Sequence, residues 1–322
     1  MWLSEFQMLH NIQRLRRYRF VGEAVSCGLC GSEDHDVISY RDRYFHPLRT
    51  VCCRHCGLVF TNPMPTSDEV TNYYKQDYRR HYSGMEKPDS RYICRAREGC
   101  TRRFEQLRPN LPTKGFIVDV GAAGGEFLNC AQEHGYQTYG IEPSGDYAEH
   151  ARSFYGLTIH TGGWRDAPIT AGSVDVVTIH HVLEHLREPL DAVRQFHQWL
   201  KPDGLLYISV PNVHRPDRTP MSRFHFAHIH NFTPKTLIML GLRAGFEPLK
   251  GRNPETTEII FRRLPQPIED WYCFPESAEE LAHYFRSHKT WKHLLRPTPY
   301  IRMGRRFANK ARELSRSWRQ AH

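Results

Sequence analysis

The sequence has no long apolar stretch. None of its 322 residues lies in a run of roughly 18 apolar residues, and residues 15–19 near its start read Leu-Arg-Arg-Tyr-Arg. A membrane-spanning helix needs about 20 such residues, and a secretory leader needs an apolar core behind its first charges. We therefore expect neither a spanning helix nor a leader, and a cytoplasmic location.

The chain also lacks an even set of cysteines, and its main body lacks net charge. Nine cysteines without a leader argue against a disulfide framework. Residues 285–322 carry eleven Lys and Arg but one acid, a net charge of +10 within a total of +9. Residues 1–284 therefore sum to −1, so the overall charge is no argument for nucleic-acid binding.

One glycine-rich stretch organises the middle of the chain. The apolar run 116–120 predicts a buried strand, 121–125 a tight turn, and 126–133 a helix. Small residues in such a turn let the backbone approach a ligand at a helix N-terminus, and the acidic Glu142 ends the next apolar run, where it suits a ribose. These features predict a cofactor that carries an adenosine. The turn lacks the third glycine of Gly-x-Gly-x-x-Gly, which disfavours a dehydrogenase.

From this stretch onward, strand and helix patterns alternate. This alternation predicts an α/β fold with a doubly wound, Rossmann-like sheet of seven mostly parallel strands. The expected strands are 116–120, 137–142, 157–161, 174–179, 204–210, 247–251 and 256–263. The expected helices are 124–134, 145–155, 188–200 and 234–245. Ligands of such sheets bind beyond the carboxyl ends of the strands, so the loops there are expected to form the site.

Four cysteines predict a metal site ahead of this domain. Cys27 and Cys30 form one Cys-x-x-Cys pair, and Cys53 and Cys56 form a second. Two such pairs can turn four thiolates toward one tetrahedral zinc ion, which would be structural because no ligand position stays open. Four buried thiols without a metal are the alternative. In this register the neighbouring Cys52 points away.

Two loops beyond the expected strands are rich in histidine. Residues 180–185 read His-His-Val-Leu-Glu-His, and residues 224–232 combine three histidines with three phenylalanines in an apparent insertion over the site. A second metal site from His225, His228 and His230 is an alternative that we do not favour, because no carboxylate lies nearby in the sequence.

At this point the residues resemble a known family. The motifs are Asp119-x-Gly-x-Ala-x-Gly125, Glu142, Asp175-Val-Val, Leu183-Glu-His185, Leu200-Lys-Pro-Asp-Gly204 and Val210-Pro-Asn212. Together they are similar to the class I S-adenosylmethionine-dependent methyltransferases. The cysteine pairs, with the sequence from Cys56 to Pro63, resemble the zinc-binding N-terminal region of a bacterial subgroup that includes sugar and polysaccharide methyltransferases. The resemblance covers roughly residues 25–263.

The resemblance implies S-adenosylmethionine as cofactor and a role for each motif. The cofactor-binding residues it implies are Asp119, Gly121, Ala122, Ala123, Gly125, Glu142, Pro143, Trp164 and His180. The loop 119–125 would hold the amino acid portion, Glu142 the ribose and Trp164 the adenine. Ala123 stands where the family usually has its central glycine, and we expect it to add a methyl group and to need a negative φ.

If the acceptor is a hydroxyl, a base must take its proton. His185 is the first candidate and His181 the second. Glu184 could orient either histidine, or it could cap the next helix instead. A purely structural histidine is the alternative for each.

The chain divides into five expected parts. They are an N-terminal helix (1–24), the zinc-binding module (25–62), a helical linker (63–113), the methyltransferase domain (114–265) and a C-terminal extension (266–322). The extension is expected to contain a basic amphipathic helix around 303–318. This helix suits an anionic membrane surface, with a partner subunit or fraying in solution as alternatives.

These observations predict methyl transfer to a hydroxyl or a carbon of a small molecule, above all a nucleotide-sugar or a cell-surface glycan precursor. An RNA or protein methyltransferase is the alternative, and so is a zinc-ribbon nucleic-acid-binding module on a methyltransferase scaffold. Nucleic acid is not favoured, because the ribbon does not interleave basic and aromatic residues. The sequence leaves the oligomeric state open.

Overall fold

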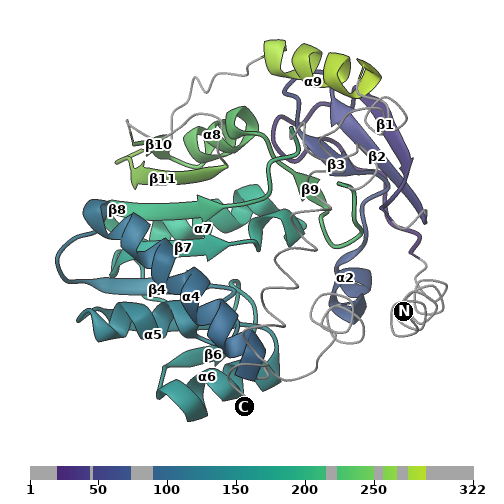
Figure 1. Ribbon diagram of the computed structural model, residues 1–322. Coiled ribbons are helices and arrows are strands. Elements are labelled where there is room, and N and C mark those ends of the chain that lie inside the picture. Colours follow the sequence, from purple (N-terminus) through teal and green to yellow (C-terminus); the bar gives the residue numbers. More distant parts are fainter. Residues whose placement is uncertain are drawn as a thin grey trace, which may run out of the picture.

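The computed structural model describes most of the chain outside its two ends. The described residues are 20–43, 46–73, 90–214, 223–249, 257–266 and 275–287. The N-terminal helix expected before residue 20 and the basic helix at 303–318 lie outside them. Two β-sheets organise the described residues, a large one and a small one beside it (Figure 1). No helix in these six ranges is both long and apolar enough to cross a membrane.

The large sheet has seven strands in the order β10-β11-β8-β7-β4-β5-β6. The five strands from β8 to β6 run parallel, and β11 and then β10 are added antiparallel at the edge. The strands are β4 (Phe116–Val120), β5 (Gln137–Glu142), β6 (Ile159–Thr161), β7 (Val174–His180), β8 (Leu200–Ser209), β10 (Phe246–Pro248) and β11 (Glu258–Arg263). This confirms the expected mostly parallel, doubly wound sheet.

Helices cover both faces of this sheet because its strands are apolar on both sides. On one face, Ile117 and Val176 pack with side chains of α4, α5 and α6. On the other, Val118 and Val177 pack with side chains of α7 and α8. The helices are α4 (Ser90–Leu107), α5 (Glu126–Glu133), α6 (Gly145–Tyr155), α7 (Pro189–Trp199) and α8 (Pro234–Arg243). A 3-10 turn, η2 (Arg108–Asn110), follows α4.

Local sequence signals explain where several of these elements begin and end. The capping box of Thr233 and Thr236 starts α8, with a proline in its first turn. Gly156 ends α6 at φ +68, in the left-handed region. The bounds of β4, β5 and α6 coincide with those expected from the sequence, whereas β8 begins four residues early because Leu200 already pairs with Val174 of β7.

The small sheet joins the cysteine region to the part of the chain that forms the large sheet. Its antiparallel order is β1-β2-β3-β9, from β1 (His35–Arg41), β2 (Pro47–Cys53), β3 (Val59–Thr61) and β9 (His230–Asn231). The last strand belongs to the histidine-rich insertion between β8 and α8, and it pairs Asn231 with Val59 and His230 with Phe60. The sheet of the cysteine region is therefore completed by residues from the insertion between β8 and α8.

Two more helices pack around this small sheet. They are α2 (Ser67–Tyr73) and α9 (Pro275–Ser287), which the sequence analysis did not single out and which contacts β1 and β2. Gly57 has φ +77, and a Cβ there would lie 3.0 Å from the backbone of Ser277 and Ala278. Only glycine fits this contact without displacing α9. In Figure 1 α9 lies on top of the purple strands of the small sheet.

Candidate active site and metal centre

The glycine turn after β4 is held by close contacts on two sides. Gly121 has φ +79, and a Cβ there would lie 2.3 Å from Cγ2 of Val182, in the loop after β7. Gly125 has φ +87, and a Cβ there would lie 2.9 Å from Cβ of Ala151 on α6. The turn therefore packs directly on the histidine-rich loop that follows β7, so two of the expected site segments touch.

Ala123 departs from the expectation for this turn. Its φ is +48, not negative as the sequence analysis expected, so an alanine occupies the left-handed conformation that glycine favours. Its backbone N–H donates to Oε2 of Glu142 over 2.9 Å. This hydrogen bond helps to hold the strained residue, and it ties the turn to the end of β5.

Glu142 is nearly buried, and backbone groups hold both of its oxygens. Its exposed fraction is 3%; Oε2 accepts from Ala123, and Oε1 accepts from the N–H of Ser144 over 2.9 Å. A carboxylate oxygen has two lone-pair directions, so Glu142 can still accept hydrogen bonds from a pair of hydroxyls. The neighbouring Pro143 is exposed.

Alternation along the strands brings Asp119, Thr178 and His180 to the face covered by α4. Thr178 donates to Oδ1 of Asp119 over 2.6 Å. Burial raises the pKa of Asp119 to about 6, although the Thr178 hydrogen bond opposes this shift. Burial also lowers the pKa of His180 to about 2, so its ring stays neutral.

Arg103 of α4 lies beside the glycine turn, and the sequence analysis did not single it out. Its guanidinium lies 5.7 Å from the ring centroid of Phe127, and its charge lowers the pKa of both Asp119 and His180. A cation beside the glycine turn suits an anionic group of a ligand. Nothing in the local sequence separates this arginine from the others on α4, because its role depends on how the helix crosses the sheet.

Trp164 lies farther along the same edge, after β6. Its ring meets Phe196 edge-on at a centroid distance of 6.3 Å, and the guanidinium of Arg165 lies 4.2 Å from its centroid. The indole is partly buried and packs against the core under α7. Trp164 therefore offers an aromatic surface on which Arg165 already stacks, and its contact with the adenine stays a prediction.

The loop after β7 carries the three residues expected to act on the acceptor. It contains a 3-10 turn, η3 (Leu183–His185), and begins with His181 at φ +52. The His181 side chain is 52% exposed, and its Nδ1 lies 3.4 Å from Oε1 of Glu184, whose side chain is 2% exposed. Nε2 of the buried His185 lies 3.8 Å from the same oxygen. The loop thus combines one exposed imidazole with a buried carboxylate and a buried imidazole.

The histidine-rich insertion closes over this loop from the side of the small sheet. The Ala227 carbonyl accepts a hydrogen bond from Nδ1 of His185 over 2.7 Å, and the Leu186 carbonyl accepts one from Nδ1 of His230 over 3.0 Å. The rings of His185 and His228 meet edge-on, 4.9 Å apart. Burial lowers the pKa of both rings, and that of His230 to about 4.

The metal set of His225, His228 and His230 does not form within the described residues. His230 turns away to Leu186, and its ring stacks near Phe60. The donor atoms of His228 instead lie within 4.8 Å of those of Glu184 and His185. The lack of a carboxylate nearby in the sequence is therefore no argument against a metal here, because the fold brings Glu184 to His228.

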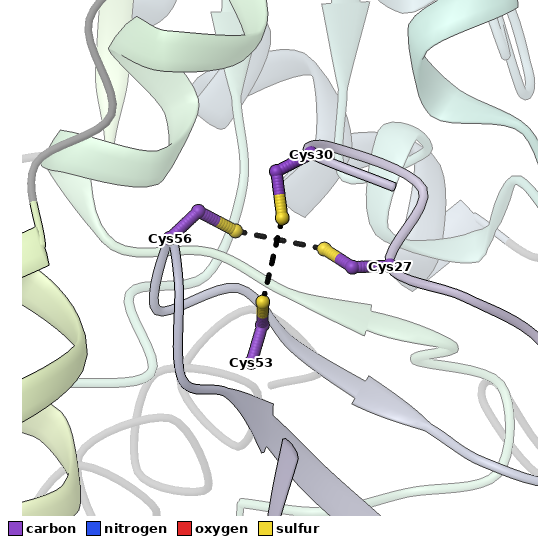
Figure 2. Close-up of side chains that lie close together, drawn as sticks. All are labelled: Cys27, Cys30, Cys53 and Cys56. Carbon is purple, nitrogen blue, oxygen red and sulfur yellow. Dashed lines mark hydrogen bonds between the residues drawn. The ribbon is translucent and has the colours of Figure 1, made fainter. Parts of the chain in front are cut away.

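The four cysteines converge as their spacing predicts (Figure 2). Sγ of Cys27 lies 3.5 Å from that of Cys56, and Sγ of Cys30 lies 3.5 Å from that of Cys53. Sulfurs around a tetrahedral zinc ion would lie about 3.8 Å apart, so the set fits one ion with little movement. Hydrogen bonds from Cys27, Cys53 and Cys56 also hold the pKa of the Cys30 thiol below its ordinary value. Cys52 packs instead in a separate apolar cluster with Leu48.

Comparison with known proteins agrees with this geometry. Residues 92–250 match a family described as a methyltransferase domain. The ubiquinone biosynthesis O-methyltransferase of Histophilus somni is 26% identical, over 56% of this chain and 67% of that protein. A probable S-adenosylmethionine-dependent methyltransferase of Mycolicibacterium smegmatis is 27% identical, over 41% of this chain and 51% of that protein.

Among solved structures, a S-adenosylmethionine-dependent methyltransferase from Mesorhizobium loti aligns with a TM-score of 0.42 at 19% identity, over 52% of this chain and 100% of that one. The matches span between about half and two thirds of the two curated relatives, and none of these names describes a sugar or a glycan as substrate. The matched domain and the strand order agree with the ordered motifs of the sequence. The chain is a class I S-adenosylmethionine-dependent methyltransferase.

Proposed function

We propose that the enzyme methylates a hydroxyl group of a small acceptor, first of all a nucleotide-sugar or a precursor of a cell-surface glycan. One observation carries the proposal: the exposed imidazole of His181 lies 3.4 Å from the buried Glu184 carboxylate, beside the glycine turn. An imidazole that is open to a ligand and backed by a carboxylate is suited to remove a hydroxyl proton.

The residues around the turn would bind the cofactor. Bound S-adenosylmethionine supplies a methyl group on a positively charged sulfur. Asp119 and the turn 121–125 would hold its amino acid portion, and Arg103 would pair with the carboxylate of that portion. Glu142 would accept hydrogen bonds from the ribose hydroxyls. The contact between Gly121 and Val182 then keeps the cofactor side and the acceptor side of the site adjacent.

His181 is better suited than His185 to accept the proton. Nδ1 of His181 faces Glu184, which favours the tautomer with the lone pair on the exposed Nε2. His185 is buried, and its Nδ1 is engaged with the Ala227 carbonyl. We therefore assign proton removal to His181, orientation of His181 to Glu184, and positioning of the loop to His185.

The resemblance of the cysteine region and the names of the relatives favour different classes of acceptor. The cysteine region resembles sugar and polysaccharide methyltransferases, which favours a hydroxylated glycan precursor. Several relatives are named ubiquinone biosynthesis O-methyltransferases, which favours a phenolic hydroxyl as the second candidate. Both candidates need one deprotonated oxygen beside the cofactor, so the same site serves either.

Incubation with radiolabelled S-adenosylmethionine distinguishes these acceptors. Nucleotide-sugars and lipid-linked sugars form one panel, and short-chain polyprenyl phenols form the other. We expect label in the first panel, in a methyl ether that survives mild base. Label only in the phenols would overturn the glycan assignment, and a methyl group on carbon would overturn the hydroxyl assignment. His181→Ala serves as the inactive control.

We further propose that the cysteine cluster binds a structural zinc ion that fixes the small sheet to the site. A Cβ at Gly28 would lie 3.9 Å from Nε2 of His230, and the guanidinium of Arg243 donates to the Leu29 carbonyl. His230 in turn donates to Leu186, next to His185. The first cysteine pair is thereby connected through β9 to the loop 181–186 after β7, which we call the acceptor loop.

We also propose peripheral contact with an anionic membrane through the basic segment 297–322, which would suit a lipid-linked acceptor. Flotation with phosphatidylglycerol-containing liposomes tests this directly. We expect the full chain to float and a chain ending at residue 296 to remain at the bottom. Equal recovery of the two would contradict the proposal. Whether the chain forms oligomers is measured separately, by light scattering.

A further inference from the structure

Three metal-ligating side chains converge at the acceptor loop. Glu184 and His185 come from η3, and His228 comes from the insertion between β8 and α8. One donor atom from each lies within 4.8 Å of the others. Ligand atoms held at 2.0–2.2 Å from a tetrahedral ion lie roughly 3.4 Å apart. Small side-chain rotations, without a change of backbone, would therefore bring these three donor atoms around one ion.

The carboxylate of this set is buried. The Glu184 side chain is 2% exposed, and within the described part of the chain neither oxygen has a hydrogen-bond partner. Its contacts with His181 and His185, at 3.4 and 3.8 Å, are ion-pair distances without hydrogen-bond geometry. A buried carboxylate in this state is costly unless it is paired or coordinates a cation.

His185 is oriented as a metal-ligating histidine is. A carbonyl oxygen can only accept, so the 2.7 Å contact with Ala227 fixes the proton on Nδ1. The lone pair of a neutral His185 then lies on Nε2, which is 3.8 Å from Oε1 of Glu184, and the ring also has a hydrogen bond with the backbone of His181. Metal-ligating histidines almost always donate their other ring N–H to a carbonyl or a carboxylate in this way.

The donor set also indicates the kind of ion. Two imidazoles and one carboxylate form the ligand set of catalytic zinc sites and of non-haem iron(II) sites. Magnesium and calcium prefer oxygen ligands, so they fit less well. Three protein ligands leave at least one coordination position for an oxygen of a ligand, unlike the four thiolates of the cysteine cluster.

We propose that Glu184, His185 and His228 bind a divalent transition-metal ion, of the zinc or iron(II) class, whose remaining position takes the acceptor hydroxyl. The binding of the ion stands by itself, whereas its use in catalysis rests on the proposed methyl transfer. The metal-bound hydroxyl gives its proton to His181 and forms the new O–C bond. The S–C bond breaks at the same time, and its electron pair stays on the cofactor sulfur. Coordination to a divalent ion lowers the pKa of a hydroxyl, so a metal-bound hydroxyl loses its proton more easily than a free one.

Metal stoichiometry in the full chain tests the site without relying on activity. The protein is stripped with a chelator, loaded with Zn²⁺ or Co²⁺, desalted and measured by inductively coupled plasma mass spectrometry. We expect two ions per wild-type chain and one ion in Glu184→Gln and in His228→Gln. His225→Gln is the matched control, because His225 lies in the same insertion but outside the donor set, and it should retain two. Cofactor affinity, measured by calorimetry, verifies that each variant folds.

Cobalt spectra assign each ion to its site. The thiolate site gives an intense sulfur-to-metal band in the near ultraviolet, and the second site gives only weak visible bands. One ion per wild-type chain, or two in Glu184→Gln, overturns the proposal. Full methylation of an acceptor by a chain with one ion would contradict the role of the second ion and leave the proposed methyl transfer standing. Two ions per chain without methylation of any acceptor would contradict the proposed methyl transfer and leave the metal site standing.

Discussion

Two groups of ligand-type side chains lie near β9, and they are built in opposite ways. The cysteine cluster takes its ligands from two short pairs, has four identical donors and leaves no open position. The cluster of Glu184, His185 and His228 takes its ligands from two distant segments and mixes carboxylate with imidazole. The closed group suits a structural role, and the open group suits binding of an acceptor.

The two groups are connected through His230. This residue belongs to β9, pairs with Phe60 of the small sheet, and donates from its ring to Leu186 beside His185. A change at the cysteines can therefore reach the acceptor loop through β9, whereas a substitution in the acceptor loop removes none of the four cysteines. This asymmetry can be tested by mutation at each group.

The largest effect is expected at the cysteine cluster. Cys53→Ser should abolish zinc binding at the cysteine cluster and unfold the small sheet, because structural zinc contributes on the order of 10 kcal/mol to the folding of small modules. Thermal unfolding with and without a chelator, together with zinc content, measures this. Cys52→Ser is the matched control: its side chain packs in another cluster, so this variant should retain zinc. Equal zinc loss in both variants would contradict the assignment of the ligands.

The next effect is confined to the acceptor loop. His181→Ala should lower kcat by about 10²- to 10⁴-fold, the usual contribution of a general base, with cofactor affinity unchanged. Imidazole added to the buffer should restore part of the rate, because the replaced side chain is exposed. The matched control is His283→Ala, on the exposed surface of α9. Full turnover by His181→Ala would transfer the role of base to another residue.

A smaller effect is expected where Glu142 holds both the turn and the proposed ribose. Glu142→Ala should weaken cofactor binding by roughly 10- to 150-fold, since a hydrogen bond to a charged group contributes about 1.5–3 kcal/mol. Calorimetry measures the affinity, with Glu149→Ala on the exposed side of α6 as control. Zinc content should stay at the wild-type value. Unchanged affinity would remove Glu142 from the cofactor site.

The two groups also differ in how far the sequence predicts them. The spacing of the four cysteines was sufficient to predict that their thiols converge, because each Cys-x-x-Cys pair makes its own local turn. The approach of His228 to Glu184 was not predictable, because it depends on the pairing of β9 with β3. That pairing joins residues far apart in the chain, and a two-residue strand has no periodicity to detect.

The same contrast holds for the large sheet. Its parallel strands and helices followed from apolar patterns and caps, and the bounds of β4, β5 and α6 were predicted to the residue. The conformation of Ala123 was missed, because residue type alone suggested a negative φ and the hydrogen bond from Ala123 to Glu142 is a tertiary contact. Arg103 was missed for a related reason, since the crossing of α4 over the sheet decides what this side chain meets.

The smallest effect concerns protons at Asp119, and it separates the cofactor side of the site from both clusters. The pKa of Asp119 in the free protein is about 6, raised by burial from 3.8. A positively charged ammonium of the cofactor beside Asp119 would lower this pKa, so binding would release a proton below pH 6. Affinity should therefore rise by up to about tenfold per pH unit as the pH rises toward 6, and level off above 7.

Calorimetry from pH 5 to pH 8, in buffers of different ionisation enthalpy, measures both the affinity and the released proton. Asp119→Asn should flatten the profile, and His180 should not contribute, because its pKa of about 2 keeps it neutral throughout. Without cofactor, Asp119 affects the stability of the fold, and this stability depends on pH with the opposite sign to the affinity. The raised pKa of Asp119 stabilises the fold below about pH 4, and this contribution is lost as the pH rises through 6. A flat affinity profile in the wild-type protein would mean that the cofactor ammonium binds away from Asp119.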